Sequence, residues 1–460
     1  MKIQFWGGVG TVTGSQHILK SGGRSLLLEC GLFQGHRQEA EEINRHLPFD
    51  ARQIDFCCVS HAHIDHIGNL PNLIRNGYRG KVLMTKPSVA LSRLLLLDAA
   101  KIQEGDIKYL NKKRRERGEP PKEPIYTTAD AEHALTRLQG ISYARREKLG
   151  PFTVHFHDAG HILGSSLIDI EVENQRVLFT GDLGRKKMPI IRDPVQVTEA
   201  DILIMEATYG DRLHGDYRDV RNRLATIINR TAERGGRIII PAFAVERAQE
   251  IVYNLKLLRQ ESAIPDLPVF VDSPLASQVT EVYRSSTAYF DTETQTLVNG
   301  EHDGPFDFPG LRYIEDVNES KKLNQLHEPC IIISPSGMCE AGRVLHHLKH
   351  SITDSKNLIL IVSFQAQHTL GRRLVEHQPV VKIFGEEFPV RAEIEVMNEF
   401  SAHADRNALL DYVKNMNLRR LRRIFIVHAE PQAAQAMIEP LHQLGIQEIT
   451  IPEKGAEYEI

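Results

Sequence analysis

The segment from Ser60 to Gly68 places three imidazoles and one carboxylate within six positions, at His61, His63, Asp65 and His66. Neutral imidazole nitrogen and carboxylate oxygen are the ligands that zinc takes in proteins. Burying so many ionisable groups without a metal would be costly, because each charge would lose its hydration. The segment therefore indicates a metal site rather than a histidine-rich surface loop.

The stretches around this cluster predict how it is held. The apolar run 56–59 predicts a buried strand, and residues 70–74 have the apolar spacing of a helix. We expect the cluster on the loop between them, where layered α/β proteins commonly build active sites. Three more polar residues directly follow apolar runs, namely His161, Asp182 and His428. A mononuclear site needs about three protein ligands, so seven candidates from four strand ends suit two metal ions that share one carboxylate.

These residues resemble the motifs of the metallo-β-lactamase fold of hydrolases. The cluster matches its H-x-H-x-D-H motif, His161 its next motif, and Asp182 its bridging carboxylate. The resemblance implies two zinc ions per chain, held by the following residues: His61, His63 and His161 for one, Asp65, His66 and His428 for the other, and Asp182 for both. It also implies an outer carboxylate beside the ligands, where the family usually has Asp and this chain has Glu29.

The later part of the chain resembles the β-CASP subfamily of this fold, whose nucleases include the pre-mRNA 3′-end cleavage subunit and RNase J. Glu206 matches the acidic residue of motif A, His403 the histidine of motif B, and His428 the histidine of motif C. DNA-acting members carry Val in motif C, so a histidine favours RNA. The resemblance implies that Asp65, His403 and Glu206 are catalytic. His403 would donate a proton to the departing ribose oxygen, and Glu206 would orient it.

Apolar strands alternate with helical stretches between about residues 209 and 382, which predicts a parallel sheet with helical crossovers. Because His428 lies beyond this unit, the unit must interrupt a first domain. We therefore expect an α/β protein in which residues 1–208 and 383–460 form an αββα metallo-β-lactamase sandwich. Residues 209–382 would form an inserted parallel-sheet α/β domain, the β-CASP domain.

Small residues and arginines follow several strands of the predicted insertion. Backbone N–H groups at such turns favour anions, and arginine can add a two-pronged contact to phosphate. The residues expected to contact substrate phosphates are Ser334, Ser336, Gly337, Arg343, Arg372 and Arg373. Two positions depart from the related pattern, because His368 and Ala429 stand where glycine is usual.

The strongest basic run, 112–117, closes a helical stretch that begins near Ser88 and is followed by Gly118, Pro120 and Pro121. Positive side chains are favoured at helix C-termini, so a solvated helix end is the leading interpretation. A rim that contacts a phosphate backbone is the alternative.

Composition bounds the remaining possibilities. A length of 460 residues suggests two domains, and the net charge of −4 gives no global sign of nucleic-acid binding, although a local basic cleft would suffice. The first residues lack the apolar segment of a signal peptide, and no apolar run could cross a bilayer. Five cysteines, two of them adjacent, indicate reduced and buried thiols. We expect a cytoplasmic protein without membrane contact, and a homodimer is left open.

These features together predict a zinc-dependent ribonuclease that hydrolyses RNA phosphodiester bonds with a hydroxide activated by two metal ions. It would be an endonuclease, with 5′-to-3′ exonuclease activity as a further option, acting on single-stranded RNA in processing or decay. One alternative is a small-molecule metallohydrolase of the lactonase or thioesterase type, which would not need the long insertion. The other is a non-catalytic RNA-binding subunit, in which metal ligands would be lost.

Overall fold

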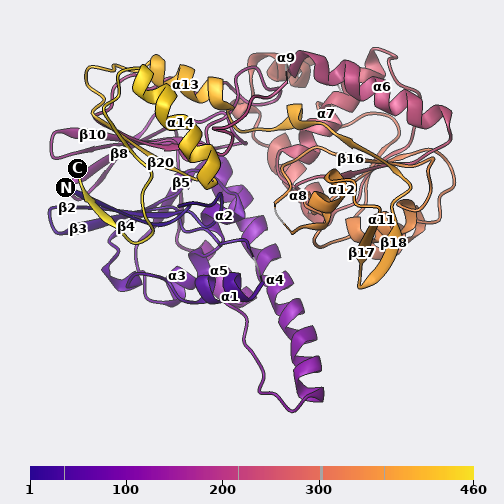
Figure 1. The fold of residues 1–460 in the computed structure, drawn as a ribbon, viewed down its shortest axis with the longest axis horizontal. Helices are drawn as coiled ribbons and strands as arrows, with labels where there is room; N and C mark the ends of the chain where they lie inside the picture. The colour runs from indigo at the N-terminus through magenta and orange to yellow at the C-terminus, as the bar shows by residue number, and fades with distance from the viewer. Residues whose placement is uncertain (36, 216, 301–303, 367) are drawn as a thin grey trace. The chain divides into compact units, whose positions relative to one another are not determined.

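The structure is a computed structural model of residues 1–460, and it describes all of them except 36, 216, 301–303 and 367. The chain forms two compact units (Figure 1). The first unit consists of Met1–Lys186, Asp193–Leu213 and His403–Ile460, and the second of Lys187–Arg192 and His214–Ala402.

The first unit contains two seven-stranded sheets. The first sheet begins with an antiparallel meander and continues with parallel strands. Its strands, in order across the sheet, are β22 (Glu457–Glu459), β1 (Lys2–Gly7), β2 (Gln16–Ser21), β3 (Arg24–Leu28), β4 (Phe56–Cys58), β5 (Val82–Thr85) and β6 (Leu138–Ile141).

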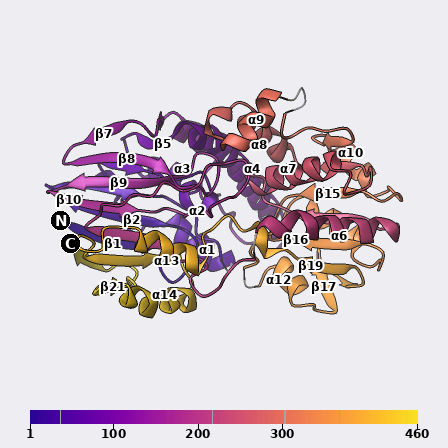
Figure 2. The same cartoon turned by 90° about the horizontal axis from the view of Figure 1, so that it is seen from above.

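The second sheet combines an antiparallel half with a parallel half, and Figure 2 shows several of its strands side by side. In order across the sheet, the strands are β21 (Glu448–Thr450), β20 (Arg423–Val427), β11 (Ile202–Glu206), β10 (Gln175–Phe179), β9 (Ser166–Val172), β8 (Phe152–Asp158) and β7 (Arg146–Leu149). Strands β10, β11, β20 and β21 run parallel, so their carboxyl ends share one edge of the sheet.

Apolar side chains of both sheets form one core, including Phe5 and Leu28 from the first and Phe156 and Ile168 from the second. A further core lies between the second sheet and the last two long helices, where Leu409 and Met437 are buried. The helices of the first unit are α1 (Arg37–Arg45), α2 (Ile64–Ile67), α3 (Leu70–Arg75), α4 (Lys86–Glu116), α5 (Thr128–Leu135), α13 (Arg406–Lys414) and α14 (Pro431–Gln443). With helices over both sheets, this is the expected αββα sandwich.

The second unit is built on the six-stranded parallel sheet that the alternating pattern predicts. Its strands, in order across the sheet, are β14 (Leu311–Tyr313), β13 (Val269–Val271), β15 (Ile331–Ser334), β12 (Ile238–Pro241), β16 (Leu358–Ile361) and β19 (Glu393–Val396), with a separate hairpin of β17 (Val380–Ile383) and β18 (Glu386–Pro389). Its helices are α6 (Val220–Glu233), α7 (Arg247–Gln260), α8 (Pro274–Arg284), α9 (Thr292–Gly300), α10 (Val317–Leu323), α11 (Val344–Ser351) and α12 (Leu370–Val375).

The second unit extends further along the chain than the expected boundary at residue 382. Strand β19 pairs in parallel with β16, so residues 393–396 are an edge strand of the inserted sheet. The chain accordingly returns to the first unit at His403 rather than at residue 383.

None of the helices in the described part of the chain combines the length and apolar character that a bilayer-spanning helix needs. All five cysteines are buried, as the sequence suggests.

Candidate active site

The candidate ligands lie at strand ends of the first unit, as their position after apolar runs predicts. His61 and His63 follow β4, Asp65 and His66 lie in α2, His161 follows β8, Asp182 follows β10, and His428 follows β20. Because β4 belongs to one sheet and the other three strands to the second, both sheets contribute to the site.

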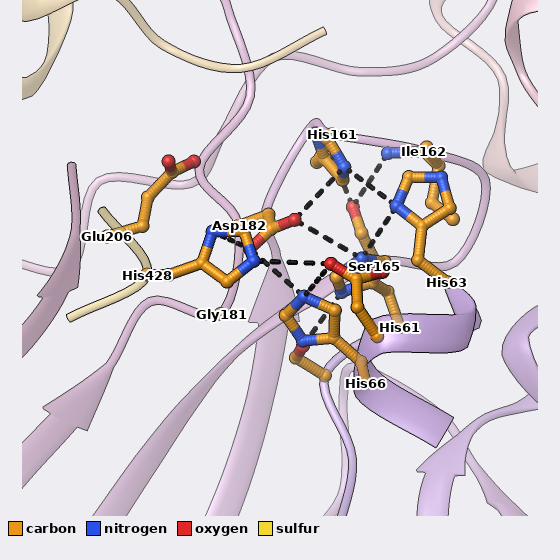
Figure 3. A network of polar contacts seen from close by, with 12 residues as sticks. His61, His63, His66, His161, Ile162, Ser165, Gly181, Asp182, Glu206 and His428 are labelled. Carbon is orange, nitrogen blue, oxygen red and sulfur yellow. Dashed lines mark hydrogen bonds and ion pairs between the residues drawn. The ribbon is translucent and has the colours of Figure 1, made fainter. Parts of the chain in front are cut away.

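One group of ligand atoms is formed by His61, His63, His161 and Asp182 (Figure 3). His63 Nδ1 lies 3.0 Å from His61 Nε2 and 3.3 Å from His161 Nε2. Asp182 Oδ2 lies 3.4 Å from His61 Nε2 and 3.5 Å from His161 Nε2. Ligands held about 2.1 Å from a tetrahedral metal are about 3.4 Å apart, so this spacing suits one zinc ion.

A second group is formed by Asp65, His66 and His428. Asp65 Oδ2 lies 3.3 Å from His428 Nε2 and 3.6 Å from His66 Nε2. Asp182 turns its other oxygen to this group, with Oδ1 3.4 Å from His66 Nε2. One carboxylate therefore presents Oδ2 to the first group and Oδ1 to the second.

Polar groups behind the ligands fix their orientation. Glu29 is fully buried; its Oε1 accepts the backbone N–H of Ser60 at 2.7 Å, and its Oε2 lies 3.2 Å from His66 Nδ1. A proton on His66 Nδ1 leaves Nε2 free as a ligand atom. The hydroxyl of Ser60 contacts His61 Nδ1 at 2.9 Å, and that of Thr208 contacts His428 Nδ1 at 3.1 Å.

Ser60 and Thr208 were not found by sequence reasoning. Each comes close to a predicted ligand or catalytic residue, next to His61 and two residues after Glu206. That adjacency is the signal that could have indicated them.

The group around His61 favours the protonation states that metals require, whereas at His66 the carboxylates of Asp182 and Asp65 outweigh burial and raise the pKa well above its usual range. Burial lowers the pKa of His61 and His161 well below the usual range, and lowers that of His63 to about 4. Burial opposes ionisation of Asp182, but the surrounding histidines hold its pKa well below the usual range. Neutral imidazoles around an ionised carboxylate are the donor set of a zinc site.

Two atoms of this cluster indicate that a further group belongs there. His66 Nε2 and Asp182 Oδ1 are buried and have no hydrogen-bond partner among the described residues. Leaving such buried polar atoms unsatisfied is costly. Because the two atoms lie 3.4 Å apart, a distance that suits two ligands of one metal ion, the residues present suit a bound metal ion.

Glu206 and His403 form a pair beside the two groups. His403 Nδ1 lies 3.0 Å from Glu206 Oε1, and His403 Nε2 lies 4.0 Å from Asp182 Oδ2. Glu206 also accepts the backbone N–H groups of Leu183 at 2.8 Å and Thr208 at 3.1 Å. Burial would lower the pKa of His403, but the Glu206 carboxylate outweighs burial and raises this pKa to about 9.

The six predicted phosphate contacts all lie in the second unit. Arg343 donates to Asp272 Oδ1 at 2.6 Å and to two backbone carbonyls, and buried Ser334 donates to the backbone carbonyl of Asp272. The turn that follows is also closed internally, because Ser336 Oγ accepts two backbone N–H groups and the carbonyl of Gly337 accepts an amide from Gln365. These contacts give the four residues a role in holding the turn.

Arg372 and Arg373 are half-buried on α12. Arg372 pairs with Glu376 at 2.7 Å, and Arg373 donates to the backbone carbonyl of His368 at 3.3 Å. His368 has a φ of 69°, which explains why glycine is usual at this position.

A third cluster, His155, His157 and Asp169, also has ligand atoms close together. Both nitrogens Nε and Nη2 of Arg176 donate to the Asp169 carboxylate, at 2.7 and 2.5 Å. Because an arginine occupies that carboxylate, this cluster is a weaker metal site than the two described above.

Three sequence families match successive parts of the chain. Residues 9–234 match the Metallo-beta-lactamase superfamily, residues 248–374 the Beta-Casp domain, and residues 387–452 the Zn-dependent metallo-hydrolase RNA specificity domain. The chain is also 36% identical to Ribonuclease TTHA0252 of Thermus thermophilus, over 99% of each chain. The chain belongs to the β-CASP family of metallo-β-lactamase proteins.

This β-CASP chain has further relatives. It is 31% identical to an RNase J-like protein of Methanocaldococcus jannaschii, over 88% of the chain and 87% of the relative. It is 29% identical to Transcription termination factor FttA of Methanosarcina mazei, over 94% of the chain and 67% of the relative. A crystal structure of a protein of unknown function from Enterococcus faecalis shares the fold, with a TM-score of 0.56 at 13% identity over 99% of each chain.

Proposed function

We propose that this chain is a ribonuclease that holds two zinc ions and hydrolyses RNA phosphodiester bonds. The observation that carries the proposal is the position of Asp182, whose two oxygens face two separate groups of ligand atoms. The ions would be held by His61, His63 and His161 on one side and Asp65, His66 and His428 on the other. When bound, such a pair of ions supplies a nucleophile from water and neutralises the phosphoryl oxygens.

The chain's own residues then move the protons. Water adds to phosphorus and the P–O3′ bond breaks, so the departing ribose oxygen requires a proton. His403 supplies it from Nε2, which points toward the site, while its Nδ1–H donates to Glu206. Asp65, whose Oδ2 faces His66 and His428, accepts the proton that the attacking water loses.

The relatives support RNA as the substrate, since the names of several of them state ribonuclease activity. The complete ligand set argues against a non-catalytic subunit, in which ligands would be lost. We propose single-stranded RNA as the form that is cut, because the phosphorus must reach a site built from buried residues.

The test is cleavage of end-labelled RNA by the zinc-loaded protein, followed by analysis of the product ends. Attack by water predicts 5′-phosphate and 3′-hydroxyl ends, whereas attack by the RNA 2′-hydroxyl would leave a cyclic phosphate. Cyclic or 3′-phosphate products would reject the mechanism.

The same preparation is assayed against single-stranded DNA and a thioester. Cleavage of the thioester without cleavage of RNA would support the small-molecule hydrolase. Binding of RNA without cleavage of any substrate would support the non-catalytic subunit. Elemental analysis should find close to two zinc ions per chain, and full activity with one or fewer would contradict the binuclear site.

A further inference from the structure

The outer half of helix α4 extends away from the rest of the first unit. The helix, which Figure 1 shows projecting from this unit, is continuous over 31 residues, and its last buried residue is Ala100. Glu104 still accepts the N–H and the hydroxyl of Thr128 at the start of α5, so the residues from 105 to 116 extend about 18 Å further, at about 1.5 Å per residue. We call residues 101–124, which comprise this half of α4 and the segment that returns beside it, the arm.

The base of α4 is fastened to the loop that carries His161. The hydroxyls of Thr85 and Ser88 donate to the carbonyl of Gly164 at 2.6 and 2.8 Å. From Ser88 to Arg115 the helix rises about 40 Å, at about 1.5 Å per residue. The arm thus leads outward from a loop of the candidate active site.

The arm is rigid because its return segment is bonded to the helix. Asn111 donates its amide to the carbonyl of Lys122 and accepts the Lys122 N–H, both at 2.8 Å. Arg114 donates to the carbonyl of Pro120 at 2.7 Å and pairs with Glu119 at 2.8 Å. The arm is therefore preformed, and a ligand would not have to order it.

One face of the arm carries a row of cations. Lys101, Lys108, Lys112 and Arg115 follow one another at the spacing of a single helix face, and all four are exposed. Within the described residues, none of the four forms an ion pair. Gly105 lies on the same face. It has no side chain, and no atom lies within 4 Å of the place that a Cβ would take, so a phosphate backbone could approach the helix closely there.

An exposed aromatic ring lies beside this row. Tyr109 is 63% exposed, and Lys113 Nζ lies 4.6 Å from the centre of its ring. Exposed rings next to cations are the combination on which the bases of single-stranded nucleic acids stack. If this part of α4 were only a solvated helix end, exposed charges would be expected on it, but an exposed aromatic ring would not.

We propose that the arm binds the single-stranded RNA that extends out of the active site, through phosphate contacts to Lys108, Lys112 and Arg115 and base stacking on Tyr109. This inference rests on the proposed ribonuclease function. A strand stacked at about 3.4 Å per nucleotide needs about 9 nucleotides to cover the 30 Å or so from Ser88 to Lys108. Long RNAs would therefore use the arm, and a tetranucleotide would not reach it.

The test compares single-turnover cleavage of a tetranucleotide and an RNA of about 30 nucleotides by Lys108→Gln/Lys112→Gln/Arg115→Gln. For the long RNA, the protein concentration giving half the maximal rate should rise at least about tenfold. The slope of the logarithm of the binding constant against the logarithm of salt concentration should become shallower by about 2, because each of the three lost phosphate contacts contributes about 0.7. For the tetranucleotide, cleavage should be unchanged. Unchanged binding of the long RNA would overturn the proposal.

A matched variant removes the same charge elsewhere. Lys321→Gln/Lys322→Gln/Lys414→Gln alters three exposed cations outside the arm and should leave long-RNA binding as it is. An equal loss in both variants would show that only net charge matters, which would also overturn the proposal. Tyr109→Ala should weaken long-RNA binding several-fold, and Tyr109→Phe, which keeps the ring, should restore it.

Failure of the proposed function is distinguishable from failure of the arm. If the unaltered protein cleaves neither RNA, fluorescence anisotropy with the long RNA still measures binding to the arm. In that case a normal affinity of the triple arm variant would overturn the arm on its own.

Discussion

His403 and Asp182 are neighbours in the site, yet their replacement is expected to have different effects. Seven other side chains are the proposed ligands of the two zinc ions, so His403→Ala should keep both ions and cleave RNA at least about a hundredfold more slowly, as the loss of a general acid does. Asp182→Ala should lose zinc as well as activity, because its oxygens face both ligand groups. Zinc analysis alongside single-turnover cleavage measures both effects.

A control for this comparison is His155→Ala, which removes a histidine of the same unit that contacts the backbone of Tyr143 instead of the site. This control should keep both zinc ions and the full rate. Loss of one zinc equivalent from His403→Ala would make that residue a ligand, and a full rate would make it structural.

Glu29 is expected to set which nitrogen of His66 carries the proton. Glu29→Gln keeps an oxygen for the Ser60 N–H but presents an amide donor to His66 Nδ1. His66 would then be protonated on Nε2, the atom that faces the metal position, so zinc affinity should fall about 10–100-fold. Competition with a chromophoric chelator measures this affinity.

Glu29→Asp is the matched control, since it keeps a carboxylate and introduces the aspartate that the family usually has at this position. It should retain more of the affinity than Glu29→Gln does. Equal affinity in the parent protein and Glu29→Gln would show that this carboxylate does not control the tautomer.

The seven candidate ligands could be predicted because each lies beside an apolar strand run, where a polar side chain is conspicuous. The contacts that orient them could not be predicted, since they join distant parts of the chain. Asp405, two residues after His403, caps α13 by accepting the N–H of Ala408 at 2.9 Å, whereas Glu206, 197 positions away, contacts His403. Adjacency in sequence did not decide which group a side chain meets.

At the scale of elements, Asp272 ties β13 to two helices of the second unit. Its buried carboxylate lies 2.6 Å from each of three partners, Arg343 Nη1, His347 Nε2 and Ser320 Oγ. Asp272→Ala should lower the free energy of unfolding by about 3–5 kcal/mol, because it leaves buried charged and polar partners unpaired. Urea unfolding measures this loss.

Ser320→Ala is the control for this network, because it removes one hydrogen bond and no charge. It should cost about 1 kcal/mol. A similar small cost for Asp272→Ala would mean that the network contributes little to stability. Zinc content should stay unchanged in both variants, since these residues belong to the second unit.

The central strands of the second unit were predictable, because fully buried parallel strands are continuous apolar runs, as at 238–240 and 331–333. Strand β19 was not, since Glu393 and Glu395 alternate along it. These carboxylates pair with Arg230 of α6 and with Arg234, which directly follows that helix. Because these charged residues interrupt the apolar pattern, the sequence did not predict this edge strand. The boundary of the inserted domain was therefore placed too early in the chain.

At the scale of the whole molecule, metal removal should act on one unit. The two ligand groups that share Asp182 lie in the first unit, where they join loops from both sheets. A ligand present at a thousandfold excess over its Kd stabilises the folded state by about 4 kcal/mol. Chelation should therefore lower the unfolding temperature of the first unit and leave that of the second unchanged.

Differential scanning calorimetry with and without chelator separates the two transitions, and returning zinc should restore the first. Equal shifts of both transitions would contradict this expectation.

The order of the ligands along the chain has a consequence for biosynthesis. Six of the seven have been synthesised once the ribosome passes Asp182, but His428 comes 363 positions after its contact Asp65. Throughout translation of the second unit, the nascent chain can complete one ligand group and not the other. The proposed two-metal site can therefore be complete only near the end of the chain's own synthesis, when His428 has joined Asp65.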